Sequence, residues 1–373
     1  MTRILHVVDS YAPVLGGIEV FVAELARRQV AAGDDVTVYT ISRGEAGGLG
    51  DPRIVRSRRG GWPILRYLPE RGAWDRDDFD VVHAHLSLVS PFATLVAQRA
   101  ARAGVPLVLS VHSIWGGRQH LLVRFIGLVA GWRRWRATWT AVSAVAARHV
   151  RRVLPTGSEV RVVCNAIDVE RWRDDLVARP GGGPVRIASV LRLVRRKRPL
   201  PLLAALRRMR AALPDDQAVE VVLVGSGPRE TDVRDFLRRH DMEDWVRLTG
   251  TLTREEIREL FRTVDLYVAP AHLESFGIAA LEARAAGVPV VAMRSGGVGE
   301  FVEDGVTGRL CDDDEALAEA LAGLVVRDGE RSRLASRARE TAPDLGWDRA
   351  LGGFATAYGA ASAQAVSRRL ARR

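Results

Sequence analysis

The sequence predicts an α/β protein made of two doubly wound domains, and three features of the chain support this. Its 373 residues suit two domains of roughly 150 residues each. Short apolar stretches alternate with segments of helical periodicity, first over the N-terminal half and again over the C-terminal half. A proline- and glycine-rich break at residues 180–184 separates the two series. Such alternation is typical of parallel sheets with crossover helices.

The first series predicts a Rossmann-like domain over residues 1–178. It opens with a strand at residues 3–9 and a helix at residues 18–32, whose apolar residues recur at helical spacing. Further strands are expected at residues 35–41, 80–85, 107–112 and 138–143.

The second series predicts a similar domain over residues 184–345, followed at residues 346–373 by a helix that packs back on the N-terminal domain. Strands are expected at residues 185–190, 219–224, 246–248, 266–269 and 289–293, and helices at 200–213, 229–240, 254–264 and 277–286. Sheets of this type bind ligands at the carboxyl ends of their strands, so a cleft between the domains is the expected site.

Composition narrows the classes of protein. With 47% hydrophobic and 27% charged residues, the chain is typical of globular proteins. Cys164 and Cys311 lie far apart and predict neither a disulfide framework nor a metal-ligand cluster. We find neither a signal-peptide core nor an apolar run long enough to span a membrane, and expect a cytoplasmic protein. The net charge of +10 suits nucleic acid, an anionic membrane or a phosphate-rich ligand, and does not choose among them.

The most specific motif is the stretch from Pro270 to Ile278, which includes Ser275 and Phe276. Glu274 precedes a predicted helix, and Glu282 lies within it. At this helix start, Gly277 allows close approach of a ligand, and the free N–H groups form an anion site suited to a diphosphate. The alternative is an ordinary acidic residue at a helix start and a solvated glutamate.

Three other groups are candidates for binding or catalysis. Arg192 and Lys197 follow the first strand of the second domain, where cations would stabilise a diphosphate, although a solvated basic run is the alternative. Gly16 and Gly17 precede a helix and offer backbone N–H groups, although a tight turn alone explains glycines there. His112 ends a strand, where a structural role is the alternative.

The motif Glu-Ser-Phe-Gly at residues 274–277, with Glu282 and then Ala-Gly-Val-Pro-Val-Val-Ala, resembles the donor-binding motif of glycosyltransferase family 4. The resemblance extends over nearly the whole chain. It implies the GT-B fold and a retaining, metal-independent enzyme that needs no cofactor and uses a nucleotide-diphosphate sugar. Leu191 and Ala166 depart from glycines common in the family, which favours the alternative of a non-catalytic nucleotide-sugar-binding protein.

The resemblance also implies roles for the candidates. It places Glu274 on the sugar hydroxyls, Glu282 on the ribose, and both Arg192 and Lys197 on the diphosphate in place of a metal ion. Gly16 and Gly17 would approach the phosphate and sugar. The residue matching His112 lies near the reacting centre. His83 and His85 have no assigned role, and no other metal-ligating residue lies beside them at the spacing of a metal site. The N-terminal domain would bind the acceptor.

The mechanism expected from the resemblance is a front-face reaction in which the leaving phosphate takes the proton of the acceptor hydroxyl. The base, the donor sugar and the acceptor, whether sugar, lipid-linked or small molecule, are not determined. A nucleic-acid partner rests on net charge alone and is not expected.

Residues 121–135 carry one further pattern. Leu121, Phe125, Leu128, Trp132 and Trp135 fall on a single helical stripe, with arginines beside it. Such a stripe is either core or a surface for peripheral contact with an anionic membrane.

Overall fold

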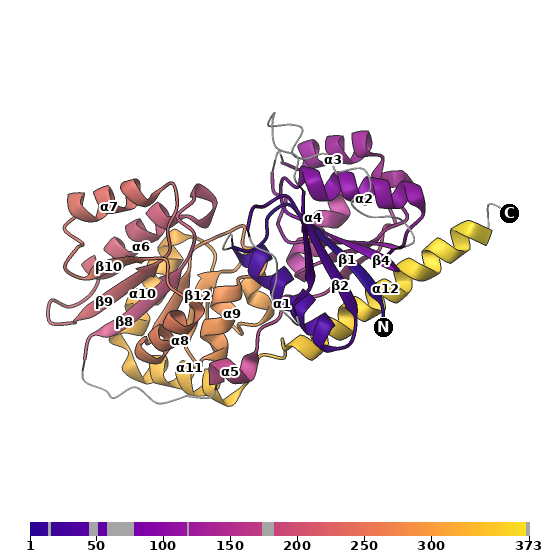
Figure 1. The fold of residues 1–373 in the computed structure, drawn as a ribbon. Helices are drawn as coiled ribbons and strands as arrows, with labels where there is room; N and C mark the ends of the chain where they lie inside the picture. Colours follow the sequence, from indigo (N-terminus) through magenta and orange to yellow (C-terminus); the bar gives the residue numbers. More distant parts are fainter. Residues whose placement is uncertain (14–15, 45–50, 58–77, 118, 174–182, 371–373) are drawn as a thin grey trace. The chain divides into compact units, whose positions relative to one another are not determined.

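The structure is a computed structural model that describes residues 1–13, 16–44, 51–57, 78–117, 119–173 and 183–370. The chain divides into two compact units (Figure 1). The first unit contains Met1–Ala166 together with Trp347–Arg373, and the second contains Ile167–Gly346. The second unit begins before the boundary predicted at residue 178, and most of the predicted break at 180–184 lies outside the described residues.

A seven-stranded parallel sheet forms the centre of the first unit. In spatial order its strands are β3 (Arg53–Arg56), β2 (Asp35–Thr40), β1 (Arg3–Val8), β4 (Val81–Leu86), β5 (Leu107–Val111), β6 (Thr138–Ala141) and β7 (Val160–Val162). Because β1 lies between β2 and β4, the strand order reverses there, and the carboxyl ends of β1 and β4 form the topological switch point.

The helices of the first unit are α1 (Gly17–Ala31), α2 (Pro91–Ala103), α3 (Gln119–Ala130), α4 (Ala144–Val153) and α12 (Trp347–Leu370). Helix α12, drawn in yellow in Figure 1, lies against β4, β5 and β6. Its Phe354 is buried, and Trp347 stacks on Phe21 of α1 with ring centroids 5.4 Å apart. The chain therefore returns to the first unit after completing the second.

The second unit is built on a six-stranded parallel sheet. In spatial order its strands are β10 (Val246–Gly250), β9 (Val219–Val224), β8 (Val185–Val190), β11 (Leu266–Ala269), β12 (Val290–Met293) and β13 (Gly308–Cys311). Its helices are α5 (Val169–Arg173), α6 (Pro199–Ala211), α7 (Glu230–Arg239), α8 (Arg254–Thr263), α9 (Ile278–Ala285), α10 (Asp314–Val326) and α11 (Asp328–Glu340). The strand order reverses between β8 and β11, which places the switch point of this sheet at their carboxyl ends.

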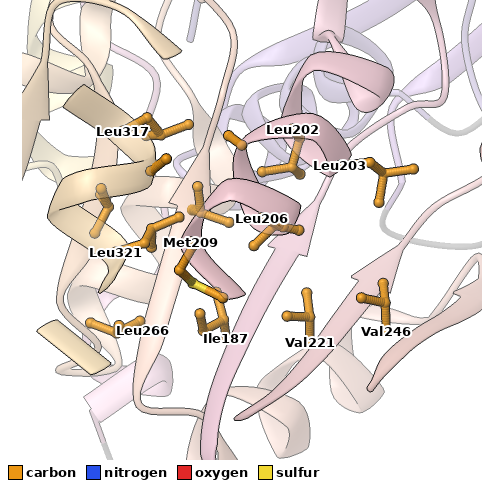
Figure 2. Packing of buried hydrophobic residues seen from close by; sticks show 14 of the residues in the cluster. Ile187, Leu202, Leu203, Leu206, Met209, Val221, Val246, Leu266, Leu317 and Leu321 are labelled. Atoms are coloured by element: carbon orange, nitrogen blue, oxygen red, sulfur yellow. The ribbon is translucent and has the colours of Figure 1, made fainter. Parts of the chain in front are cut away.

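Apolar side chains from α6 and α10 cover one face of this sheet (Figure 2). Leu206 and Met209 of α6 lie over Ile187 of β8, while Leu321 of α10 packs beside them, and all four are fully buried. Burying each such side chain contributes about 1.5–3 kcal/mol. This packing holds β8 and β11 rigidly, so the loops that follow them start from fixed points.

The predicted fold class is confirmed by the two doubly wound parallel sheets. The prediction missed β3, β7 and β13, which are strands of three or four residues at or near sheet edges and lack a continuous apolar run. The prediction that residues 121–135 form a single helical stripe is wrong. Helix α3 ends at Ala130 because Gly131 adopts a left-handed conformation with φ of 76°, and Trp132 and Trp135 are buried beyond it.

Candidate functional site

The candidate site of the second unit lies in the loops after β8 and β11, at the switch point of the sheet. Residues 191–198 follow β8, and residues 270–277 connect β11 to α9. Adjacent strands bring these two loops together although they are far apart in the sequence. The structure therefore places Arg192, Lys197 and Glu274 in neighbouring loops at one edge of the sheet.

The loop after β8 is held by a glycine turn that follows β9. Leu193 N–H donates to the Ser226 carbonyl at 2.9 Å. A Cβ on Gly225 would lie 1.9 Å from the Leu191 carbonyl oxygen, so only glycine permits this approach. The turn at residues 225–227 thus supports the basic loop. Leu191 makes its backbone contact with this turn, although a glycine is common at its position in the family.

The loop after β11 ends in an open helix start. Gly277 has φ of 95°, a left-handed conformation that favours glycine, and it is the N-cap of α9. No described side chain caps the helix, so its first N–H groups are available to an anion. The Phe276 ring is buried against Phe301 at 5.4 Å and anchors the loop, while Ser275 and Ile278 stay partly exposed.

A close ion pair joins the two loops. Lys197 Nζ lies 2.5 Å from Glu274 Oε2, and the two side chains are 35% and 13% exposed. Arg196 donates to the Leu273 carbonyl at 3.2 Å and ties the loops a second time. Arg192 is exposed and makes no ion pair with the described residues. The arrangement offers one cation that is held in place and one that extends from the surface.

A second glycine turn, at Gly296 and Gly297, packs against Glu274. Gly297 N–H donates to the Glu274 carbonyl at 2.8 Å. A Cβ on Gly297 would lie 2.4 Å from the Ser275 carbonyl oxygen, and one on Gly296 would lie 3.1 Å from Glu274 Cβ. The contact that requires these glycines depends on the tertiary structure, and no pattern in the sequence shows it.

Glu282 is buried on α9 rather than solvated. It is 7% exposed, and Arg254 donates to its Oε1 from Nε at 3.2 Å. Burial raises the pKa of Glu282 to about 7, although the nearby Arg254 opposes this shift. Arg254 also lies over the Trp172 ring at 5.6 Å. The sequence did not single out Arg254, because nothing in its spacing links the start of α8 to α9.

The first unit carries the remaining candidates. Gly16 and Gly17 lie at the start of α1, where the Glu19 side chain folds back so that a Cβ on Gly16 would meet Glu19 Oε2 at 2.3 Å. His112 directly follows β5 and is 6% exposed. Its Nε2 lies 3.0 Å from Nδ1 of His85, so His112 belongs to a buried polar network.

Chemically, the second unit offers a carboxylate, a cation and a helix start within one short region. Backbone N–H groups and cations bind phosphate, and a carboxylate accepts hydrogen bonds from sugar hydroxyls.

Among the described residues, no helix is long and apolar enough to cross a membrane.

Comparison with solved structures identifies the fold. A crystal structure of Anabaena HepE in complex with UDP and glucose aligns with a TM-score of 0.76 at 20% identity, covering 95% of this chain and 99% of that one. Sucrose-phosphate synthase from Thermosynechococcus elongatus aligns with a TM-score of 0.73 at 19% identity, covering 96% and 98%. These neighbours establish the GT-B fold.

Sequence comparison identifies the family. The model of glycosyltransferase family 4 matches residues 15–171, and that of glycosyl transferases group 1 matches residues 171–341. Glycogen synthase from Mycobacterium tuberculosis is 30% identical over 93% of this chain and 81% of its own length. D-inositol 3-phosphate glycosyltransferase from Salinispora tropica is 31% identical over 94% and 82%. The chain therefore belongs to glycosyltransferase family 4 and transfers sugar from a nucleotide sugar, as the sequence predicts.

Proposed function

We propose that this enzyme is a retaining glycosyltransferase that moves a sugar from a nucleotide-diphosphate sugar to an acceptor hydroxyl without a divalent metal ion. The Lys197–Glu274 pair carries the proposal. In such a donor the diphosphate is bonded to the anomeric carbon, so the groups that bind phosphate and sugar must lie a few ångströms apart. A cation and a carboxylate 2.5 Å apart, beside the open start of α9, meet this requirement.

Charge supports the proposed metal independence. A cation about 4 Å from a phosphate charge gains roughly 4 kcal/mol at an effective dielectric constant near 20, before desolvation. Lys197 and Arg192 would together neutralise the charge that develops on the leaving diphosphate, a task that a divalent ion performs in other enzymes. Glu274 would hold the sugar hydroxyls, and Glu282 the ribose.

A front-face reaction fits the state of the two carboxylates. Glu274 is paired with Lys197 and Glu282 with Arg254, so neither is placed as a free nucleophile. In the proposed step the acceptor oxygen bonds to the anomeric carbon on the face from which the diphosphate departs. The C–O bond to the phosphate breaks, and a phosphate oxygen takes the acceptor's proton. Positioning and charge stabilisation supply the catalysis.

The test combines nucleotide release with product stereochemistry. The full chain is incubated with UDP-, GDP-, ADP- and dTDP-sugars and simple hydroxyl acceptors, with UDP-glucose first because HepE has been crystallised with it. We expect release that persists in EDTA, a product with the donor's anomeric configuration, and no turnover by Glu274→Gln. An inverted product would contradict retention, and turnover lost in EDTA would contradict metal independence. Binding without release would favour the non-catalytic alternative.

We also propose that α3 contacts an anionic lipid surface. Leu121, Phe125, Leu128 and Val129 are each at least 63% exposed on this 12-residue helix, and Arg124 beside them is exposed too. An apolar face with cations beside it suits the boundary between headgroups and acyl chains. The net charge of +10 favours anionic over zwitterionic lipid.

Vesicle sedimentation tests this surface. We expect the chain to sediment with vesicles containing phosphatidylglycerol and far less with phosphatidylcholine alone, and Phe125→Ser with Leu128→Ser to abolish the difference. Val366→Ser in α12 is the matched control, since Val366 is 56% exposed elsewhere in the same unit. Equal binding by the double variant, or a dimer that buries α3 in solution, would overturn the proposal.

A further inference from the structure

A continuous chain of buried side chains runs from Gln29 of α1 to His112. Gln29 Oε1 lies 2.7 Å from His6 Nε2, and His6 Nδ1 lies 2.9 Å from His85 Nε2. His85 Nδ1 lies 3.0 Å from His112 Nε2. Three hydrogen bonds therefore connect the core of the first unit to the histidine that follows β5.

The parallel sheet explains why these imidazoles meet. His6 of β1 is in register with His83 of β4, and His85 lies two residues further along the same strand. Residues two apart in a strand share a face of the sheet, so the rings gather on one side. All are buried: His6 and His83 are fully covered, and His85 is 1% exposed.

Burial fixes the charge of these rings. It lowers the pKa of His6 and of His112 to about 4, and it lowers the pKa of His85 well below its ordinary value. The rings are therefore neutral near pH 7. A neutral imidazole has one N–H donor and one acceptor nitrogen, so each bond in the chain determines the direction of the next.

The amide of Gln29 sets that direction. Its Nε2 donates to Tyr358 Oη at 2.9 Å, so its Oε1 accepts from His6 Nε2–H. His6 Nδ1 must then accept from His85 Nε2–H, and His85 Nδ1 must accept from His112 Nε2–H. His112 is left with its proton on Nε2 and a lone pair on Nδ1.

We infer that Gln29, His6 and His85 are positioning residues that hold His112 in the Nε2–H tautomer, with Nδ1 ready to accept a hydrogen bond from a substrate hydroxyl. The inference rests on the proposed function and on the family resemblance, which implies that His112 lies near the reacting centre. The chain acts through His112 and contacts no substrate itself. Gln29 would therefore affect turnover from a fully buried place in α1.

The same cluster could be considered as a metal site, because His6, His83 and His85 offer nitrogens within 4.8 Å of one another. The hydrogen bonds favour the positioning role. His83 is bonded at Nδ1 to Tyr358 Oη at 3.0 Å and at Nε2 to Ser110 Oγ at 2.6 Å. Every ring nitrogen of the three is engaged, so a metal ion would have to break bonds that are already made.

The experiment measures the tautomer directly and activity separately. The eight histidines are labelled with ¹⁵N in the full chain, and the His112 signal is assigned with His112→Gln. Gln29→Met removes the acceptor for His6 Nε2–H. Gln29→Glu keeps an acceptor there and should therefore keep the tautomer of the wild type. Gln98→Met is the matched control, because Gln98 donates to the Ala130 carbonyl in the same unit, outside the network. Each sample is measured with Zn²⁺ and with EDTA.

We expect the Nε2–H tautomer in the wild type, Gln29→Glu and Gln98→Met, and a mixture of tautomers in Gln29→Met. The kcat of Gln29→Met should fall about fivefold, the usual effect of one lost hydrogen bond, with KM changed less. An Nδ1–H tautomer in the wild type, or an unchanged tautomer in Gln29→Met, would overturn the inference. So would signals of His6, His83 and His85 that shift on adding Zn²⁺. A wild type with the expected tautomer but no turnover would refute the proposed function alone.

Discussion

Replacing Lys197 with alanine tests the proposed donor site most directly. A phosphate oxygen that contacts the Lys197 ammonium would lie within about 4 Å of its charge. The Coulomb energy there is roughly 4 kcal/mol at an effective dielectric constant near 20. The side chain is 35% exposed, so we discount this value to about 2 kcal/mol for desolvation and screening. We therefore expect kcat/KM to fall about 30-fold.

Arg195→Ala is the matched control for this variant. Arg195 lies in the same short helical turn, is exposed, and makes no side-chain hydrogen bond or ion pair with the described residues. Both variants lower the net charge by one. Steady-state nucleotide release gives kcat/KM, and calorimetry with the intact nucleotide sugar gives its affinity. Equal losses in the two variants would show that only net charge matters and would refute the assigned contact.

Three further variants test the supporting structure. Burial raises the folded pKa of Glu282 from 4.5 to about 7. The free energy of unfolding of the wild type, relative to that of Glu282→Gln, should therefore fall by up to about 3 kcal/mol as the pH rises through this range. Urea titrations that give a constant difference between the two proteins would contradict the shift. Gly297→Ala should weaken donor binding at least tenfold, because its Cβ would lie 2.4 Å from the Ser275 carbonyl oxygen. The control Gly299→Ala should bind the donor normally, because its Cβ would meet only Leu310 Cδ1, at 3.3 Å. Equal affinities of the two variants by calorimetry would contradict the supporting role of the turn. Asp9 caps the start of α2, because its carboxylate accepts from the N–H groups of Phe92 and Ala93, each at 3.0 Å. Asp9→Ala should lower the free energy of unfolding by about 1–2 kcal/mol, and Asp9→Asn by less. Thermal unfolding that ranks the two variants the other way would refute the capping role.

Local patterns accounted for much of the architecture. Most strands of both sheets are rich in apolar and β-branched residues, as parallel sheets buried on both faces require, so they were found within a residue or two. Edge strands such as β3 are only half-buried and carry arginines, so no such run identifies them. The end of α3 was missed because a helical stripe continues in sequence past Gly131, where the backbone stops being helical.

The sequence by itself determined the fold class, the family and the candidate residues, because each depends on a local pattern or a motif. Only the tertiary structure decided how these residues are paired. Lys197 meets Glu274 across 77 positions, and Glu282 meets Arg254 across 28. His6, His85 and His112 form one directed network because β1, β4 and β5 are neighbours in the sheet. Contacts of this kind depend on strand order and register, which the sequence pattern of a single strand does not contain.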